Sequence, residues 1–125
     1  MLQTTFLNDT GNNVISSLAV GSGQTITTQG VECVNTNFGL AGLFIIHNGT
    51  VNSVTREVSY DNTTFYTPWD KSASLGALIT TSANNSRFLA LNFVNSGNIV
   101  SPYVRYNVTM LSGGTLSLIH INDEK

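Results

Sequence analysis

Few residues in this chain of 125 have the types and spacing that catalysis requires. The two histidines, His47 and His120, each end an apolar run, and neither has a second metal ligand at motif spacing. The one cysteine, Cys33, has no base or cation next to it in the sequence that would activate a thiol. We therefore expect two histidines that lie in sheets with their hydrogen bonds satisfied, and a cysteine that fills space in the core.

Asp61 and Asp70 flank a segment that contains amide, hydroxyl and aromatic side chains. Two carboxylates with Asn62 and backbone carbonyls between them could coordinate Ca²⁺, which takes about six to eight oxygen ligands. The spacing matches no dedicated calcium loop, and Asp and Asn are also ordinary turn residues. We therefore predict no metal and no cofactor. Since the sequence also lacks a serine-nucleophile elbow, a phosphate-binding loop and a dinucleotide fingerprint, we predict that the protein is not an enzyme.

Four aromatic residues gather in this segment: Tyr60, Phe65, Tyr66 and Trp69. Aromatic rings beside Asn and Asp can hold a glycan by stacking and hydrogen bonding. They can also anchor a protein interface, where Tyr and Trp contribute much of the binding energy. A purely structural alternative is that they cap one end of the core with their polar tips outward. The four residues are the predicted contacts to a partner protein or a glycan.

Short runs of β-forming residues, separated by turn residues, extend through the whole chain, and no stretch has helical periodicity. Residues 103–110 alternate between apolar and polar, as half-buried strands do. Residues 40–47 are apolar at nearly every position, which predicts a strand that is covered on both faces, and residues 115–121 are expected to form a final strand that is apolar on both faces. Asn48-Gly49 after the first of these runs predicts a β-hairpin with a type I′ turn.

About eight such runs without a helix predict an all-β fold in which two antiparallel sheets pack as a sandwich. The expected topology is a jelly roll or a similar Greek-key arrangement. The sequence contains no internal repeat, low-complexity block or linker. We therefore expect residues 1–125 to form a single β-sandwich domain.

Charged residues make up 10% of the chain, against about 25% in an average protein. With five Lys and Arg and a net charge of −2, the chain lacks the basic patch that nucleic-acid binding requires. The longest apolar run, residues 38–46, is too short to cross a membrane, and the first residues do not resemble a signal peptide. We expect synthesis in the cytoplasm and a surface of Thr, Ser and Asn that packs beside copies of itself or a polar partner.

Three short motifs carry a resemblance to known proteins. Residues 58–65, Val-Ser-Tyr-Asp-Asn-Thr-Thr-Phe, resemble a jelly-roll hairpin in which Ser-x-Asp-Gly precedes an aromatic residue, although Asn62 replaces the glycine. Residues 103–106 (Tyr-Val-Arg-Tyr) resemble a later strand of the same sandwiches, and residues 112–115 (Ser-Gly-Gly-Thr) resemble the turn after it. This order, over about half the chain, is similar to that of small structural proteins of tailed bacteriophages. More distantly, it is similar to discoidin-like and carbohydrate-binding jelly rolls.

The resemblance implies a non-enzymatic structural protein of the virion, made in the host cytoplasm. In particular, it implies a capsid decoration protein that binds in many copies to the head exterior and cements neighbouring subunits. Its partners would be the major capsid protein or other virion proteins, and copies of itself. Two alternatives stay open, namely a fibre or tail component and a β-sandwich module that binds surface glycans through the four aromatic residues.

Overall fold

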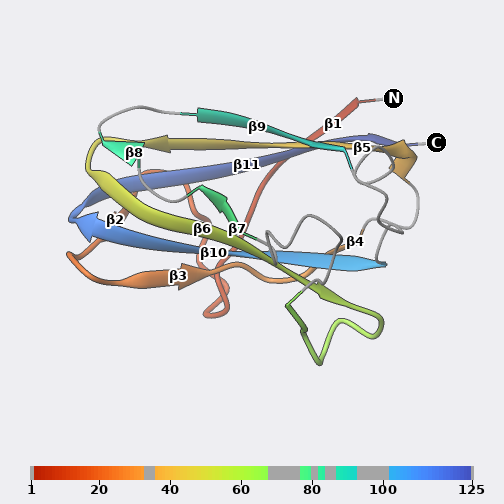
Figure 1. Ribbon diagram of the computed structural model, residues 1–125, viewed down its shortest axis with the longest axis horizontal. Coiled ribbons are helices and arrows are strands. Elements are labelled where there is room, and N and C mark those ends of the chain that lie inside the picture. Colours follow the sequence, from red (N-terminus) through yellow and green to blue (C-terminus); the bar gives the residue numbers. More distant parts are fainter. Residues whose placement is uncertain are drawn as a thin grey trace.

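The computed structural model describes residues 2–32, 36–67, 77–79, 82–83, 87–92 and 102–124. These residues form strands and turns, and none belongs to a helix that could cross a membrane (Figure 1). The strands are β1 (Leu2–Phe6), β2 (Leu18–Val20), β3 (Thr25–Thr27), β4 (Val31–Glu32), β5 (Thr36–His47), β6 (Thr50–Ser59), β7 (Ala77–Ile79), β8 (Ser82–Ala83), β9 (Arg87–Asn92), β10 (Tyr103–Ser112) and β11 (Gly114–Glu124).

The strands form two antiparallel sheets that lie as two layers in Figure 1. The first sheet has the order β1-β11-β5-β9, with β2 also on β11, and the second has the order β3-β10-β6-β7, with β4 on β10 and β8 on β6. Strands β1 and β2 pair with different stretches of β11, so they share one edge position. The pairs β3/β4 and β7/β8 share positions in the same way. The eleven described strands therefore occupy eight positions, four in each sheet.

Numbered along the chain, the eight positions pair first with last, second with seventh, third with sixth and fourth with fifth. Successive pairs alternate between the two sheets. This pattern is what a long antiparallel hairpin gives when it rolls up, and it defines the jelly roll. The predicted all-β sandwich of two antiparallel sheets, with jelly-roll topology and about eight strands, is confirmed.

The core lies between the two sheets and follows the alternation of the strands. In β10 every second residue is buried, and in β11 the buried apolar residues continue the same layer from the other sheet. Antiparallel partners share a face of their sheet, so inward residues meet across strands. The fully buried apolar side chains are Ile15, Leu43, Ile45, Val51, Val54, Val104, Tyr106, Val108, Met110, Leu116 and Leu118.

The prediction of a hairpin at Asn48-Gly49 is wrong. The turn leads from β5 in the first sheet to β6 in the second, and neither residue has the positive φ of a type I′ turn. A Cβ atom on Gly49 would lie 2.7 Å from the Ser112 carbonyl oxygen, and the Asn48 Oδ1 atom accepts a hydrogen bond of 2.8 Å from the Thr115 N–H. Both residues therefore pack closely against the β10–β11 turn, which crosses between the same two sheets.

Candidate functional site

The loop after β6 contains three of the four predicted contact residues. The Asp61 carboxylate fixes its shape, because it accepts hydrogen bonds of 3.0 Å from the N–H groups of Thr63 and Thr64 and from the Ser59 hydroxyl. The backbone hydrogen bonds, from Thr64 first, hold the pKa of the Asp61 carboxyl below its usual value. Asn62 has a φ of 60°, a conformation in which glycine is common, so it fills the glycine position of the resembled motif.

The aromatic residues of this loop have different surroundings. Tyr60 is 70% exposed and Tyr66 is 53% exposed. Phe65 is half-buried, with the Arg105 guanidinium 4.1 Å from its ring centroid. The fourth predicted contact, Trp69, lies outside the described residues, as do Cys33 and Asp70. The loop thus presents Tyr60 and Tyr66 and uses Phe65 for packing, and their contact with a partner stays a prediction.

The outer face of the second sheet is polar, and its side chains bind one another. Glu57 accepts hydrogen bonds from Arg105 Nε at 3.0 Å and from Asn107 Nδ2 at 2.7 Å. Burial raises the pKa of the Glu57 carboxyl, but the hydrogen bonds from Arg105 and Asn107 outweigh burial and leave the pKa below its usual value. Farther along the sheet the hydroxyl groups of Thr25 and Thr109 are 2.8 Å apart. The polar side chains named here therefore find hydrogen-bond partners within the face itself.

The outer face of the first sheet is apolar. Phe6 on β1, Ile119 on β11 and Phe44 on β5 form one cross-strand row. Phe6 is 46% exposed and Ile46 is 44% exposed, whereas Phe44, Ile119 and Ile121 are half-buried. We call these five residues the apolar face.

The apolar face is not among the predicted contacts, although the sequence carries a signal for it. The pattern predicts a strand covered on both faces over residues 40–47 and a strand apolar on both faces over residues 115–121. In the structure their inward residues meet the second sheet, while Ile46 remains 44% exposed on the other side. A two-sided apolar pattern shows that both faces favour burial, but it does not show what buries the second face.

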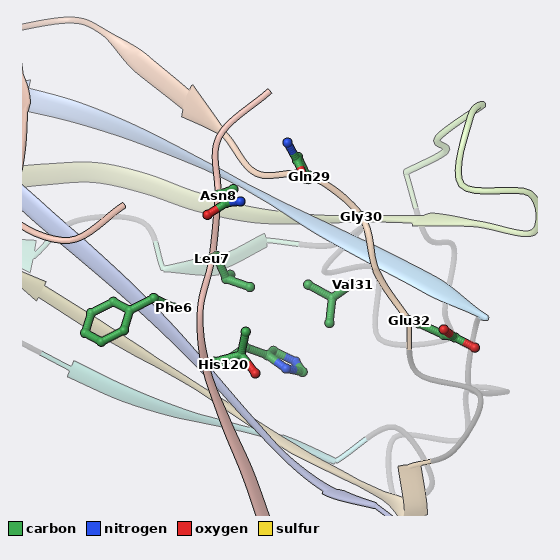
Figure 2. A pocket seen from close by; sticks show the side chains of 9 residues that line it. Phe6, Leu7, Asn8, Gln29, Gly30, Val31, Glu32 and His120 are labelled. Atoms are coloured by element: carbon green, nitrogen blue, oxygen red, sulfur yellow. The ribbon is translucent and has the colours of Figure 1, made fainter. Parts of the chain in front are cut away.

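A cleft opens at the edge of the sandwich between β1 and the segment from Gln29 to β4, and we call it the edge cleft (Figure 2). Its volume is about 250 Å³. At one end the Gln29 N–H donates a hydrogen bond of 2.9 Å to the Asn8 carbonyl, which joins the two sheets. The lining residues are Thr5, Phe6, Leu7, Asn8, Gln29, Gly30, Val31, Glu32 and His120.

The two histidines differ in their hydrogen bonds. His47 is buried and its Nδ1 atom lies 3.0 Å from the Gly49 carbonyl oxygen, so the expectation of a satisfied sheet histidine is confirmed. His120 is 1% exposed, with its ring 6.0 Å from that of Tyr106, and its Nε2 atom has no hydrogen-bond partner among the described residues. Burial lowers the pKa of His120 to about 4. The expectation of satisfied hydrogen bonds is wrong for His120, because the fold buries its Nε2 atom where no described residue offers it a hydrogen bond.

A second cleft, of about 310 Å³, lies beside the edge cleft and includes Phe65 and Arg105. The two clefts share Gln29 and Gly30. Among the described residues no group of three His, Cys, Asp or Glu side chains is placed to hold a metal ion. The described surface therefore offers three features to a partner: the exposed tyrosines, the apolar face and the clefts.

No protein-family model matches the chain, and no curated protein matches it. Among solved structures, the chain is similar to a family 89 glycoside hydrolase from Clostridium perfringens in complex with PUGNAc, and to the same enzyme in complex with its substrate GlcNAc-alpha-1,4-galactose. Each match has 12% sequence identity and a TM-score of 0.41. It covers 100% of this chain but only 14% of the enzyme. At this TM-score the likeness carries no conclusion about function.

Proposed function

We propose that this protein is a non-enzymatic structural protein of a virion, and that it decorates a capsid by docking its apolar face onto the shell. The apolar face is the observation that carries the proposal. Phe6 and Ile46 are nearly half exposed on the same sheet surface, with Phe44, Ile119 and Ile121 beside them. Exposed apolar side chains that gather on one face, instead of lying scattered over the surface, can mark an interaction site.

Docking by this face is favourable because it removes apolar surface from water. Burial of the exposed half of Phe6 or Ile46 contributes about 1 kcal/mol for each side chain. A single copy would bind modestly, since association also costs translational and rotational entropy. If one copy touches two neighbouring shell subunits, the first contact holds it close to the second subunit, so the second contact forms at a high effective concentration. The two contacts together then bind more tightly than either one alone.

The composition and the motif resemblance support the same proposal. Only 10% of the residues are charged, so neighbouring copies on a shell would repel one another weakly. The Asp61 loop and the strand β10, which carry two of the resembled motifs, form as the resemblance implies, in a jelly roll. The proposed partners are therefore the major capsid protein or another virion protein, and further copies of this chain.

A copy count tests the proposal. Particles that contain this chain are purified, and its ratio to the major shell protein is measured by quantitative mass spectrometry. A fixed ratio that corresponds to hundreds of copies supports decoration. A handful of copies would instead place the chain in a tail, neck or fibre. Its absence from any particle would overturn the virion proposal as a whole.

A further inference from the structure

The outer edge of β1 carries backbone groups that no described strand uses. Among the described strands β1 pairs only with β11, at the end of the first sheet. The Leu7 N–H donates a hydrogen bond of 3.0 Å to the Leu118 carbonyl, so the backbone of Leu7 faces β11. This direction alternates along an antiparallel strand, so every second residue before Leu7 points its N–H and C=O away from β11. These outward residues are Leu2, Thr4 and Phe6.

The described residues leave open the space beside this edge. The Gln29 N–H donates a hydrogen bond of 2.9 Å to the Asn8 carbonyl and so ties the chain after β1 to the other sheet. Before that point the edge cleft separates β1 from the segment that leads into β4 (Figure 2). The side chain of Thr4 is exposed and that of Phe6 is 46% exposed. A further strand can therefore approach β1 along its outer edge.

Strand β1 also lacks the features by which edge strands avoid pairing with other chains. Such protection comes from charged side chains, proline, bulges or a very short strand. The five residues of β1 include no charged residue and no proline, and its register with β11 runs without a bulge. The other described edge strands are two or three residues long, except β9, which begins with the charged Arg87. Among the described edges, β1 is thus the least protected.

We propose that the outer edge of β1 pairs with the same edge of a second copy of this chain, in an antiparallel dimer whose two-fold axis passes through Thr4. In this register Thr4 exchanges its N–H and C=O with the partner's Thr4, and Phe6 does so with the partner's Leu2. Every outward backbone group of β1 then has a hydrogen-bond partner. An axis at Gln3 would leave Phe6 opposite a residue outside the strand, and an axis at Thr5 would do the same to Leu2.

The side chains of β1 suit a second copy as the occupant. Thr4 meets the partner's Thr4 on the axis, and cross-strand threonine pairs stabilise antiparallel sheets. The chain already forms one such pair, because Thr25 and Thr109 lie opposite each other with their hydroxyl groups 2.8 Å apart. Since β1 carries no charge, two copies do not repel each other at this edge, and no charge calls for a strand of opposite sign.

The dimer joins the two apolar faces. A two-fold axis within an antiparallel sheet keeps the same face outward in both copies, so the first sheets form one continuous sheet with Phe6 of each copy near the seam. The dimer would then present two apolar faces on one side, as bridging of neighbouring shell subunits requires. This consequence deepens the proposed function and rests on it, whereas the pairing of β1 can be tested on the isolated chain.

The first test measures association of the isolated full chain by sedimentation equilibrium at up to about 1 mM. A single short strand pair is smaller than stable interfaces, which bury roughly 1,200–2,000 Å², so we expect a dissociation constant of about 0.1–1 mM. Thr4→Lys places two ammonium groups opposite each other on the axis and should raise this constant at least tenfold.

The matched control is Thr25→Lys, which changes an exposed threonine on the edge strand β3 of the other sheet and should stay within twofold of wild type. Circular dichroism checks that both variants fold. A wild-type chain that remains monomeric at the highest concentration, or an equal loss of association in the two variants, would overturn the proposal.

The second test determines the register. Thr4→Cys is combined with Cys33→Ala, so that the introduced thiol is the only one in the chain. Residues of a hydrogen-bonded antiparallel pair have Cα atoms about 5.5 Å apart, within the range of about 4.4–6.8 Å that a disulfide spans. Under mild oxidation we expect disulfide-linked dimers to form at least tenfold faster with Thr4→Cys than with Thr25→Cys in the same background.

Phe6→Cys checks the position of the axis. In the proposed register the two Phe6 residues lie about 13 Å apart along the strands, so Phe6→Cys should cross-link as slowly as Thr25→Cys. Equal rates at the three positions, or the fastest rate at Phe6, would overturn the proposed pairing.

Purified particles separate this inference from the decoration proposal. If the isolated chain is monomeric while Thr4→Cys cross-links to a different protein in particles, β1 pairs with the shell, and the dimer is overturned while decoration stands. If the chain dimerises through Thr4 but occurs in no particle, the dimer stands and decoration is overturned.

Discussion

The outer faces of the two sheets have opposite chemistry, although both sheets bury apolar side chains in the common core. On the second sheet, Glu57, Arg105 and Asn107 bind one another and leave a polar surface. On the first sheet, Phe6 and Ile46 are nearly half exposed in the same kind of position. Strand alternation explains the polar face, because one side of each strand is buried and the other meets water. It does not explain the apolar face, which we propose docks onto a partner.

The strongest test of this comparison places a charge on the apolar face and, as a control, at an exposed apolar residue outside it. Ile46→Asp puts a carboxylate on the apolar face, and we expect attachment to shells to fall about a hundredfold, since a charge buried at an interface without a partner costs several kcal/mol. Leu111→Asp is the matched control, because Leu111 is 57% exposed and lies outside the apolar face. Attachment is measured by cosedimentation with shells, and circular dichroism checks that both variants fold. Equal loss in the two variants would contradict a specific role for the apolar face.

A second test addresses the turns that join the two sheets. Gly49→Ala would place a Cβ atom 2.7 and 2.8 Å from two backbone carbonyl oxygens, so the turns must separate, and we expect a loss of about 2–3 kcal/mol in the free energy of unfolding. In the control Gly21→Ala, the new Cβ would meet only a flexible side-chain atom at 3.5 Å. Urea unfolding measures both variants. A loss below 1 kcal/mol at Gly49, on the order of an ordinary surface change, would show that the turns do not pack as described.

A third test measures how the free energy of unfolding depends on pH through His120. His120, on the inner side of the first sheet, has a pKa lowered by burial from 6.5 to about 4. In the unfolded chain His120 is protonated below about pH 6.5, whereas in the folded chain it stays neutral down to about pH 4. The contribution of neutral His120 to the free energy of unfolding is therefore complete above about pH 6.5 and is lost as the pH falls to about 4. Between pH 7 and pH 5 the expected loss is about 2 kcal/mol.

Urea unfolding at pH 7 and pH 5 measures this loss. The carboxylates with lowered pKa values, Asp9, Glu57 and Asp61, have ordinary values of 3.8 to 4.5, so their contributions are lost mainly at lower pH. His120→Phe removes the titrating group, and its stability should change by less than half as much as that of wild type over this interval. The same loss in both proteins would exclude His120 as the cause.

The smallest expected effect concerns the polar face. Glu57→Ala removes the acceptor for Arg105 and Asn107, and we expect the free energy of unfolding to fall by about 1 kcal/mol, because the pair is only partly buried. Shell attachment should not change, because the proposed docking uses the apolar face on the opposite sheet. Unfolding and cosedimentation on the same preparation measure both quantities. A tenfold loss of attachment would mean that the polar face also meets the shell.

The fold could be predicted because it depends on a pattern that is local along each strand. Apolar and polar residues alternate in β10 as predicted. The sequence has no helical periodicity and has turn residues between its β-forming runs, and these two features indicated the two-sheet sandwich. That the Asn48-Gly49 turn leads into the other sheet could not be predicted in the same way. Turn propensity concerns neighbouring residues, whereas β5 and β6 are assigned to different sheets by pairing with distant strands.

The candidate site was less predictable than the fold. Residue type selected Tyr60 and Tyr66, which the structure shows to be exposed and whose contact with a partner stays a prediction, but it could not show that Phe65 packs beneath Arg105. The edge cleft combines residues from β1, β4 and β11, and no sequence spacing links them. The missing partner of His120 Nε2 is likewise a tertiary property. Sequence patterns predict which side chains favour burial, while the packed structure decides which of them remain uncovered.

Oxidative footprinting by hydroxyl radicals, on the free chain and on the chain in purified particles, tests the central claim most directly. The side chains of Phe6 and Ile46 are exposed enough to react in the free chain, as are those of Tyr66 and Leu111. We predict that oxidation of Phe6 and Ile46 falls at least tenfold in the particle, while Tyr66 and Leu111 react as before. Unchanged oxidation of Phe6 and Ile46 in the particle would contradict docking by the apolar face.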